Sequence, residues 1–466
     1  MLMLMKEQIR KIIQAAAGVD GFSFDVSYPD PKFGDYATNA GLILAKLRKQ
    51  KPQDTARDLI EKMDKSMFEG VEIAGPGFIN IKLKLQILAT SPVPSMTGHP
   101  LLEEEGKAGK VLIDYFSPNI AKPLHIGHLR NLIIGDALRR LLAFAGFSVE
   151  ADNHLGDWGT QFGILIYAYK NYGEPKTVAK DPVNELNRLY IQFNRELERR
   201  PELKDAAKQE FVRLEQGDGE NRGIWKQFVD WSLAKFETVH DLMGILQFEH
   251  AWGESFYEDK MPAVVAKLKE KNLLVESQGA QIVDLQPQGL GVGIIIKSDG
   301  TTTYLLRDLA TFLYRKSLGF TRQLYVVDSR QAHAFRQLFA ILALLGEDPA
   351  QAVHVDYGFV SFKGAALSTR KGNMILAEDV IAQAEEKVAK IVTEKNPNLP
   401  DKERAVAAIA KGALKYFDLK HNRRSDIEFD WAEVLDFEGD SGPYLQYAYA
   451  RLSSILQKAQ NPNPKI

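Results

Sequence analysis

The chain reads Ser117-Pro118-Asn119-Ile120-Ala121-Lys122-Pro123-Leu124-His125-Ile126-Gly127-His128 between an apolar run and a segment with helical spacing. The run before it, residues 110–116, predicts a buried strand, and residues 129–145 carry apolar side chains three and four positions apart, as a helix does. Both histidines therefore fall where a strand passes into a helix. A helix start offers unpaired backbone N–H groups to an anion, and Gly127 lets a ligand approach the backbone closely. The stretch thus predicts a phosphate-binding site.

The segments on either side of this stretch predict a parallel sheet. Within residues 109–170 the order is strand, helix, a second strand at 148–152 and a second helix, which is the pattern of a βαβ unit. The same alternation returns later, with strands at 293–297 and 324–328 and a helix over 305–317 between them, and we expect these strands to complete the sheet. Ligands of such sheets bind at the carboxyl ends of the strands, where the two histidines fall.

The remaining segments differ in character and predict further domains. The N-terminal segment begins with an expected amphipathic helix and ends with a strand of alternating apolar residues, which predicts a small α+β domain. The Pro- and Ser-rich stretch after it indicates a linker. Charged helical segments at about 171–275 predict an insertion in the α/β domain. The predicted boundaries are 1–90 for the N-terminal domain, 91–108 for the linker, 109–375 for the α/β domain, 376–440 for a helical region and 441–466 for a last helix.

Composition narrows the function classes. The 466 residues carry 59 Lys and Arg against 61 Asp and Glu, so a nucleic acid would have to be bound by local patches, because the net charge is −2. The absence of cysteine excludes disulfides, thiolate zinc sites and cysteine nucleophiles, and it fits a reducing compartment. No segment has the length of a membrane span, and the apolar start is too short for a signal peptide, so we expect a cytoplasmic protein without membrane attachment.

Two histidines three residues apart could also bind a metal ion or be structural, and for an isolated pair the structural reading is the better one. No cysteine and no evident third ligand support zinc here, so no protein-bound metal is expected. Asn119, Lys122 and Gly127 instead suit an anion above the end of a strand. In that setting His125 and His128 would stabilise charge on a phosphoryl group without a covalent role.

The histidine stretch resembles the His-Ile-Gly-His signature of the class I aminoacyl-tRNA synthetases. Two neighbouring runs, residues 117–122 and His154-Leu155-Gly156-Asp157-Trp158-Gly159-Thr160-Gln161-Phe162-Gly163, resemble the arginyl-tRNA synthetases in particular. Four residues alone would be weak, but three such runs in order within about fifty residues are highly specific. The resemblance covers residues 1 to about 458. It implies an α/β fold: a Rossmann-like parallel-sheet catalytic domain with a helical insertion, a small α+β N-terminal domain and an all-α C-terminal segment.

Class I synthetases carry a second signature, Lys-Met-Ser-Lys-Ser, whose lysines meet the phosphates of ATP. The matching run here is Ala366-Leu367-Ser368-Thr369-Arg370-Lys371-Gly372, in which both family lysines are absent in register. Arginyl enzymes commonly show such a loop, and the lysine ahead of the histidine signature, here Lys122, is thought to compensate. Taken alone, a basic loop with flanking glycines is more often a solvated turn. The resemblance implies catalytic roles for His125, His128, Lys122, Arg370 and Lys371, and ATP contacts by His125, Gly127, His128 and Ser368.

A binding pocket for a guanidinium group can be argued from the residues themselves. Carboxylates hold this planar, always charged group best, with an aromatic face beside its plane. Tyr304 and Asp308 are four residues apart, hence on one helix face, and Asp114 lies in the strand before the histidines. Taken alone, Asp308 could be an exposed helix acid and Tyr304 a core aromatic. The resemblance implies that Asp114, Tyr304, Asp308 and Gln331 contact the arginine side chain, whereas Ser117, Asn119 and His128 hold its amino and carboxylate groups.

Two further segments predict contacts with tRNA. Phe78 and Asn80 alternate with Ile79 and so share one strand face, where a ring and an amide could hold an unstacked base. A buried Phe is the commoner explanation for such a residue in isolation. The resemblance implies that these two side chains contact the D-loop of tRNA. It also implies that Arg423 and Arg424 belong to a second tRNA-contacting turn.

The sequence therefore predicts an arginine–tRNA ligase, which forms arginyl-adenylate from L-arginine and ATP and transfers the arginyl group to the terminal ribose of tRNA(Arg). Magnesium is expected with ATP, zinc is not, and the protein is expected to be a monomer. Family members continue past the helical run 443–451 into an anticodon-binding domain, of which this chain holds only the opening helix. The alternatives are a synthetase for another amino acid and a catalytically impaired tRNA-binding relative or fragment.

Overall fold

The computed structural model describes residues 2–19, 22–29, 33–84, 109–362 and 375–460. The chain divides into two compact units, residues 1–104 and 105–466, which are called the N-terminal unit and the large unit below. Each unit has a hydrophobic core of its own. Among the described residues, no helix combines the length and the apolar character that a membrane span requires.

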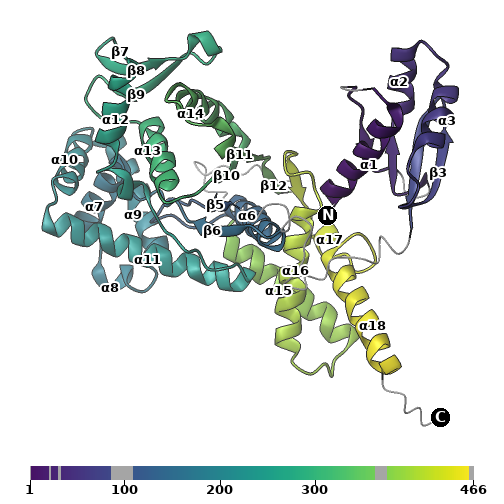
Figure 1. Ribbon diagram of the computed structural model, residues 1–466. Helices are drawn as coiled ribbons and strands as arrows, with labels where there is room; N and C mark the ends of the chain where they lie inside the picture. The colour runs from purple at the N-terminus through teal and green to yellow at the C-terminus, as the bar shows by residue number, and fades with distance from the viewer. Residues whose placement is uncertain (1, 20–21, 30–32, 85–108, 363–374, 461–466) are drawn as a thin grey trace. The chain divides into compact units, whose positions relative to one another are not determined.

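The described part of the N-terminal unit is an antiparallel sheet with helices, which agrees with the predicted α+β class (Figure 1). The strands lie in the order β1-β2-β4-β3 and have the bounds Val26–Ser27 (β1), Tyr36–Thr38 (β2), Phe68–Ala74 (β3) and Phe78–Leu83 (β4). The helices are Leu2–Ala17 (α1), Ala40–Arg48 (α2) and Pro52–Lys62 (α3). Alternation along β4 turns Ile79 and Ile81 into the core and leaves Phe78 on the outer face.

The large unit is built around a parallel sheet in the strand order β11-β10-β5-β6 (Figure 1). The strands are Lys110–Asp114 (β5), Ser148–Asp152 (β6), Arg322–Asp328 (β10) and Ala352–Tyr357 (β11). The register pairs Asp114, at the end of β5, with Asp152 of β6 on one side and with Tyr325 of β10 on the other. The carboxyl ends of neighbouring strands therefore bring two acids side by side, at the edge where ligands of such sheets bind.

Helices cover this sheet and connect its strands. They are Ile126–Phe144 (α6), Thr160–Tyr172 (α7), Tyr304–Ser317 (α13) and Ala332–Leu344 (α14). The buried residues Leu132 and Ile133 of α6 belong to the same core as Val111 and Ile113 of β5, the strand that precedes this helix. Both the predicted fold class and the predicted strand-to-helix position of the histidines are confirmed.

One predicted strand of this sheet is wrong. The strand expected at 293–297 forms as Val292–Ile296 (β9), but it pairs antiparallel with Ala280–Asp284 (β8), which pairs with Leu274–Ser277 (β7) in a separate sheet. Val292 and Ile294 of β9 are exposed, whereas strands of a covered parallel sheet are buried on both faces. The edge place beside β10 is taken by β11 instead.

The predicted helical insertion is present and lies between β6 and the small sheet. Its helices are Pro175–Val178 (α8), Pro182–Arg199 (α9), Leu203–Glu215 (α10), Gly219–Met243 (α11), Glu254–Tyr257 (η2) and Met261–Glu270 (α12). Helix α9 begins with a proline in its first turn. Helix α11 begins after Asp218, whose side chain accepts a hydrogen bond from the backbone N–H of Asn221.

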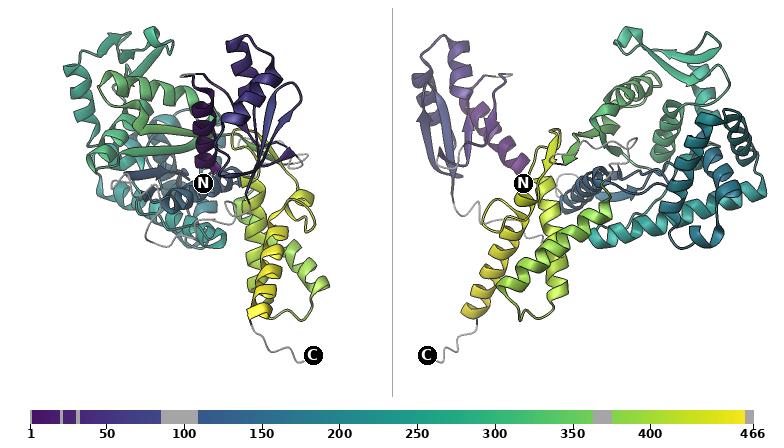
Figure 2. Two further views of the ribbon diagram at one scale, coloured as in Figure 1. Left: turned by 45° about the vertical axis from the view of Figure 1, so that its right-hand side comes forward. Right: turned by 180° about the vertical axis from the view of Figure 1, so that it is seen from behind.

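The last part of the chain is helical, as predicted, apart from one short strand. Its helices are Ala377–Lys395 (α15), Lys402–Leu419 (α16), Trp431–Val434 (α17) and Gly442–Gln460 (α18), and α16 lies between α15 and α18 (Figure 2). The strand Ile427–Phe429 (β13) pairs in parallel with Val360–Phe362 (β12). Short 3-10 turns lie at Gln286–Gln288 (η3), Ser329–Gln331 (η4) and Pro349–Gln351 (η5).

Candidate active site

The histidine stretch forms the first turn of α6. His125 is the N-cap residue, and its Nδ1 accepts a hydrogen bond from the backbone N–H of Gly127 at 3.1 Å. The backbone N–H of His125 donates to Nδ1 of His128 at 3.0 Å, and the two ring centroids lie 3.9 Å apart. This reciprocal capping fixes both rings at the helix start. A Cβ at position 127 would lie 2.9 Å from Cε1 of His125, so glycine is what leaves room for the ring.

The same hydrogen bonds determine the tautomer of each neutral imidazole. Because Nδ1 accepts in both rings, the ring proton lies on Nε2. Burial lowers the pKa of His125, with a further contribution from Arg330, and burial lowers the pKa of His128 well below its ordinary value, with a contribution from His125. Both rings are therefore neutral at pH 7. Among the described residues neither Nε2–H has an acceptor, so the helix start presents two free N–H donors.

The runs 117–122 and 154–163 lie side by side beyond the ends of β5 and β6. The backbone N–H of Ile120 donates to the carbonyl of Gly156 at 3.3 Å, and the N–H of Gly156 donates to the carbonyl of Pro118 at 3.0 Å. A Cβ at position 156 would lie 2.3 Å from Oδ1 of Asn119, so this close approach requires glycine. Two stretches that are separate in sequence therefore form one wall of the candidate site.

The connection from β5 to the histidines is strained. Phe116, Ser117 and Ala121 have positive φ angles of 78°, 41° and 57°, a region that residues with a Cβ rarely adopt. Each such residue costs on the order of 1–3 kcal/mol, and such strain concentrates at functional sites. The surrounding fold holds the segment in place: the backbone N–H of Ala121 donates to Oγ of the buried Ser232 on α11 at 2.8 Å.

Asp308 carries the free carboxylate of the candidate site. Burial, together with the charge of Asp114, raises the pKa of Asp308 to about 7, and Arg307 and Arg315 offset part of this shift. In the part of the chain that the structure describes, no donor or cation is bonded to this carboxylate. Tyr304 lies one turn earlier on α13 and is 68% exposed, so it is not the core aromatic that was considered as an alternative. The helix thus presents an acid and a ring on one side.

Asp114 is already engaged by the protein itself. Its Oδ1 accepts a hydrogen bond from Oγ of Ser117 at 2.9 Å, and its Oδ2 is 2.8 Å from Nη2 of Arg315. The same Nη2 is hydrogen-bonded to Asp152 at the end of β6. Neither Arg315 nor Asp152 was predicted as a site residue, although Asp152 ends a predicted strand and the reasoning used for Asp114 applies to it as well.

Asp114, Asp152 and His154 are close enough together to be considered as metal ligands, because one ligand atom of each lies within 4.8 Å of the others. The guanidinium of Arg315 occupies the position between the two carboxylates, however, and supplies the positive charge that they need. Burial lowers the pKa of His154 to about 4, so its ring is neutral beside this cation. The cluster is therefore an internal ion pair, and we assign no metal to it.

Two other predicted residues lie at the same end of the sheet with different surroundings. Lys122 follows the strained segment; its Nζ is 5.4 Å from the ring centroid of Tyr190, and burial lowers its pKa. Gln331 ends the turn η4 after β10, and its side chain is exposed. No hydrogen bond joins Gln331 to Tyr304 or Asp308 among the described residues.

Arg330 is a cation that sequence reasoning missed. It follows β10 directly, its guanidinium lies 3.8 Å from the ring centroid of Phe359, and it is 2.8 Å from a carboxylate oxygen of Asp328. It contributes to the lowered pKa of His125. Its position after the carboxyl end of a parallel strand is the signal that could have identified it.

The run 366–372 lies outside the described residues, and with it Ser368, Arg370 and Lys371. The chain that follows it is attached to the histidine stretch. The backbone N–H of Ile126 donates to the carbonyl of Ile375 at 3.2 Å, and the N–H of Ala377 donates to the carbonyl of Leu124 at 2.9 Å. The segment after the predicted second signature is therefore fixed to the first.

The predicted tRNA-contacting residues differ in their availability. Phe78 is 42% exposed, against the commoner expectation of a buried ring, and Asn80 is half-buried on the same face of β4. Arg423 and Arg424 both pair with Asp356, at 2.7 and 3.0 Å. Because Arg423 also donates to the carbonyl of Asp356, its guanidinium is largely engaged within the protein, whereas the Arg424 side chain is 67% exposed.

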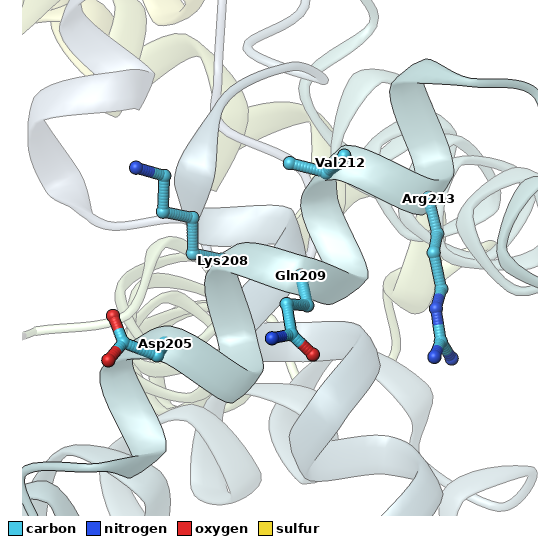
Figure 3. A pocket seen from close by; sticks show the side chains of 5 residues that line it. All are labelled: Asp205, Lys208, Gln209, Val212 and Arg213. Atoms are coloured by element: carbon cyan, nitrogen blue, oxygen red, sulfur yellow. The ribbon is translucent and has the colours of Figure 1, made fainter. Parts of the chain in front are cut away.

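A hollow of about 520 Å³ lies away from this site, along α10. Its lining residues all come from that one helix, as Figure 3 shows: Asp205, Lys208, Gln209, Val212 and Arg213. No strand end and no residue of the histidine stretch contributes to it. The carboxyl ends of β5, β6 and β10, with the start of α6 and one face of α13, remain the candidate active site.

A parallel sheet whose first strand leads through a His-Ile-Gly-His helix start defines the catalytic domain of a class I aminoacyl-tRNA synthetase. Comparison with known families gives the same class: residues 97–431 match "tRNA synthetases class I (R), catalytic domain", and residues 3–83 match "Arginyl tRNA synthetase N terminal domain". The chain belongs to the arginyl-tRNA synthetase family, and the resemblance seen in the sequence is confirmed.

Individual relatives agree with this assignment. An arginine–tRNA ligase of Clostridium botulinum (strain Alaska E43 / Type E3) is 42% identical over 94% of this chain and 78% of its own length. One of Lactococcus lactis subsp. lactis is 41% identical over 98% of this chain and 81% of its own length. Among solved structures, the arginyl-tRNA synthetase of Plasmodium falciparum superposes with a TM-score of 0.80 at 26% identity, covering 99% of this chain and 82% of that one. The Thermus thermophilus enzyme gives 0.76 at 27% identity, with 98% and 83% coverage.

Proposed function

We propose that the large unit binds L-arginine and ATP at the carboxyl ends of β5, β6 and β10, forms arginyl-adenylate there, and passes the arginyl group to tRNA(Arg). The chain is an arginine–tRNA ligase, and the single observation that supports this location of its site is the free carboxylate of Asp308. Asp308 is partly buried, and a carboxylate that the protein leaves without a partner at such a position favours a cation. A guanidinium supplies both the charge and a planar set of N–H donors.

In the first reaction a carboxylate oxygen of arginine attacks the α-phosphorus of ATP, and the bond from that phosphorus to the bridging oxygen of pyrophosphate breaks. Negative charge builds on the phosphoryl oxygens during this step. The Nε2–H groups of His125 and His128 are the donors that we propose to stabilise it, since both rings are neutral, fixed and unpaired at Nε2 among the described residues. No protein nucleophile takes part, so catalysis consists of positioning and charge stabilisation.

The remaining ATP contacts are proposed from the family resemblance together with position. Lys122, Arg370 and Lys371 would neutralise the departing pyrophosphate, and Gly127 and Ser368 would contact the nucleotide. Lys122 is suited to this role because it is partly desolvated and has no carboxylate partner among the described residues. Magnesium would arrive with the phosphates of ATP as part of the substrate.

The arginine substrate would lie between α13 and the strand ends. We propose that Asp308 and Tyr304 contact its guanidinium directly, with Gln331 at the side and with Asp114, which is paired with Arg315, next to the pocket. The amino and carboxylate groups of the substrate would be held by Ser117, Asn119 and His128. The run of strained residues that carries Ser117 supports this placement, because strain of this kind fixes the direction of a ligand-binding backbone.

The N-terminal unit would contact the D-loop of tRNA through Phe78 and Asn80, and Arg424, with Arg423 behind it, would contact a second part of the tRNA. An exposed ring beside an amide suits an unstacked base. The domain boundaries predicted from the sequence are part of this proposal. We also propose a cytoplasmic location, because charged tRNA is consumed there. We propose a monomer, since every residue of the proposed site comes from one chain.

The experiment that tests this function compares arginine with citrulline, in which a neutral ureido group replaces the guanidinium. We expect tRNA charging and ATP–pyrophosphate exchange with arginine and a loss of at least about 100-fold in kcat/KM with citrulline, because Asp308 would be left without its counter-ion. Equal use of both amino acids would contradict the proposal.

The affinity for arginine is expected to depend on pH around neutrality. Only the ionised form of Asp308 attracts a guanidinium, and with a pKa of about 7 its ionised fraction rises about tenfold between pH 6 and pH 8. The KM for arginine should therefore fall about tenfold over this range, and Glu254, whose pKa burial raises to about 8, acts in the same direction. Steady-state kinetics at saturating ATP measure this, with Asp308→Asn as the variant that should lose most of the dependence.

Replacing Phe78 by Ala is expected to raise the KM for tRNA about 10-fold, since stacking on a base contributes about 1–3 kcal/mol. The KM for arginine should not change. Leu47→Ala, which removes another exposed apolar side chain of the same unit, is the matched control. A KM for tRNA that is the same in both variants would remove Phe78 from the proposed contact.

A further inference from the structure

A fully buried arginine lies beside the proposed pocket. Arg315, in the last turn of α13, has no exposed side-chain surface. Its Nη2 is 2.8 Å from Asp114 and is also hydrogen-bonded to Asp152, and these two acids are paired in register at the ends of β5 and β6. One cation of the chain therefore holds together two carboxylates at the edge of the sheet where the substrate cation is proposed to bind.

The way in which Arg315 uses its guanidinium argues against a role in stability alone. A strong arginine–carboxylate pair is bidentate, with two parallel N–H groups on one carboxylate. In Arg315, Nη2 alone contacts both Asp114 and Asp152, whereas Nε and Nη1 have no hydrogen-bond partner among the described residues. A buried ion pair with unmet donors is often no more stable than an apolar replacement. Its effect on the charge of the site is the better explanation.

That effect reaches Asp308. Asp308 and Arg315 are seven residues apart on α13, which is about two helical turns, so both project from the same side of the helix. Asp114 raises the pKa of Asp308, whereas Arg315 and Arg307 lower it. The charge of Asp308 in turn raises the pKa values of Glu254 on η2, Tyr304 on the same helix and Tyr325 on β10, so these groups also face it.

We propose that Arg315 is a positioning residue that determines how the substrate guanidinium is bound. It neutralises Asp114 and Asp152, so that Asp308 is the acid left free for the substrate. Both oxygens of Asp114 are already occupied, by Arg315 and by Ser117, which prevents the substrate from pairing with the wrong acid. The guanidinium of Arg315 thereby directs the guanidinium of the substrate to Asp308 on α13. This inference rests on the proposed function, because it concerns the arginine pocket of that reaction.

The test is the pH midpoint of the KM for arginine in two variants whose expected shifts have opposite signs. Arg315→Gln removes the cation and leaves Asp114 and Asp152 uncompensated, so the midpoint should rise by about one pH unit. Asp152→Asn is isosteric and leaves Arg315 less compensated, so the midpoint should fall. Lys316→Gln, which removes a half-exposed cation of the same helix that is paired with Glu347, is the control and should leave the midpoint unchanged.

A purely structural role would not shift the midpoint in opposite directions. Midpoints that agree with the unmodified protein within about 0.2 pH units, or that move the same way in both variants, would overturn the inference. Should Arg315→Gln fail to fold, Asp152→Asn decides alone: a lower midpoint supports the inference, and an unchanged or higher one overturns it. The failure of the proposed function is distinguishable, since the unmodified protein would then show no arginine-dependent exchange at any pH.

Discussion

The variant Asp308→Asn is expected to raise the KM for arginine by about 100- to 1000-fold, because a buried guanidinium that loses its paired carboxylate costs about 3–5 kcal/mol. The substitution keeps the size of the side chain and removes its charge. The KM for ATP should change by less than about threefold, since Asp308 lies on α13 and the histidine donors lie on α6. ATP–pyrophosphate exchange, with arginine and ATP varied in turn, gives both values.

The matched control is Asp259→Asn, which removes an exposed acid from the large unit and should leave both KM values unchanged. Comparison of the two variants separates loss of the pocket from a general loss of negative charge. Equal increases in the two KM values for Asp308→Asn would contradict the assignment of Asp308 to the arginine pocket.

The second large effect is expected at His128. Asparagine at this position can still accept the hydrogen bond from the backbone N–H of His125 through Oδ1, but it has no group where Nε2–H lies. His128→Asn should therefore preserve the helix start and lower the kcat of exchange by about 100- to 1000-fold, the usual effect of removing one donor to a developing oxyanion.

His128→Gln is the companion variant, because its amide N–H lies near the place of Nε2–H. It should recover part of the activity that His128→Asn loses, although its capping of His125 is weaker. A kcat for His128→Asn within about threefold of the unmodified protein, measured with tRNA present, would show that the Nε2–H group has no part in adenylate formation.

Most of the fold was predicted from the histidine stretch and from the apolar segments before and after it. The strand 148–152 and the helix start at His125 could be predicted because apolar periodicity and a glycine-rich turn are local signals. The strand 292–296 was assigned to the wrong sheet because a short apolar run does not reveal its pairing partner. In the structure this strand pairs antiparallel with β8, and the strand β11, which takes the edge beside β10, was not predicted from the sequence.

The residues of the proposed site were chosen from a recognisable motif and from helical spacing. Asp308 and Tyr304 follow from helical spacing. The role of Arg315 could not be predicted, since it acts through strand residues far away in sequence: Arg315 lies 163 residues from Asp152. Arg330 was missed although its position after a strand is a local signal, and its contact with Phe359 is the part that the sequence does not show. The free state of Asp308 also depends on Arg315 and Asp114 occupying each other, which is a property of packing rather than of any local pattern.

We propose that the free acid of α13 and the two neutral histidines of α6 form a single site for activating arginine. The most direct test is ATP–pyrophosphate exchange, in the presence of tRNA(Arg), for each of the twenty amino acids. We expect exchange with arginine to be at least about 100-fold faster than with any other amino acid, lysine included, because only a guanidinium matches both the charge and the planar donors required. Exchange that is as fast with lysine, or with a neutral amino acid, would contradict it.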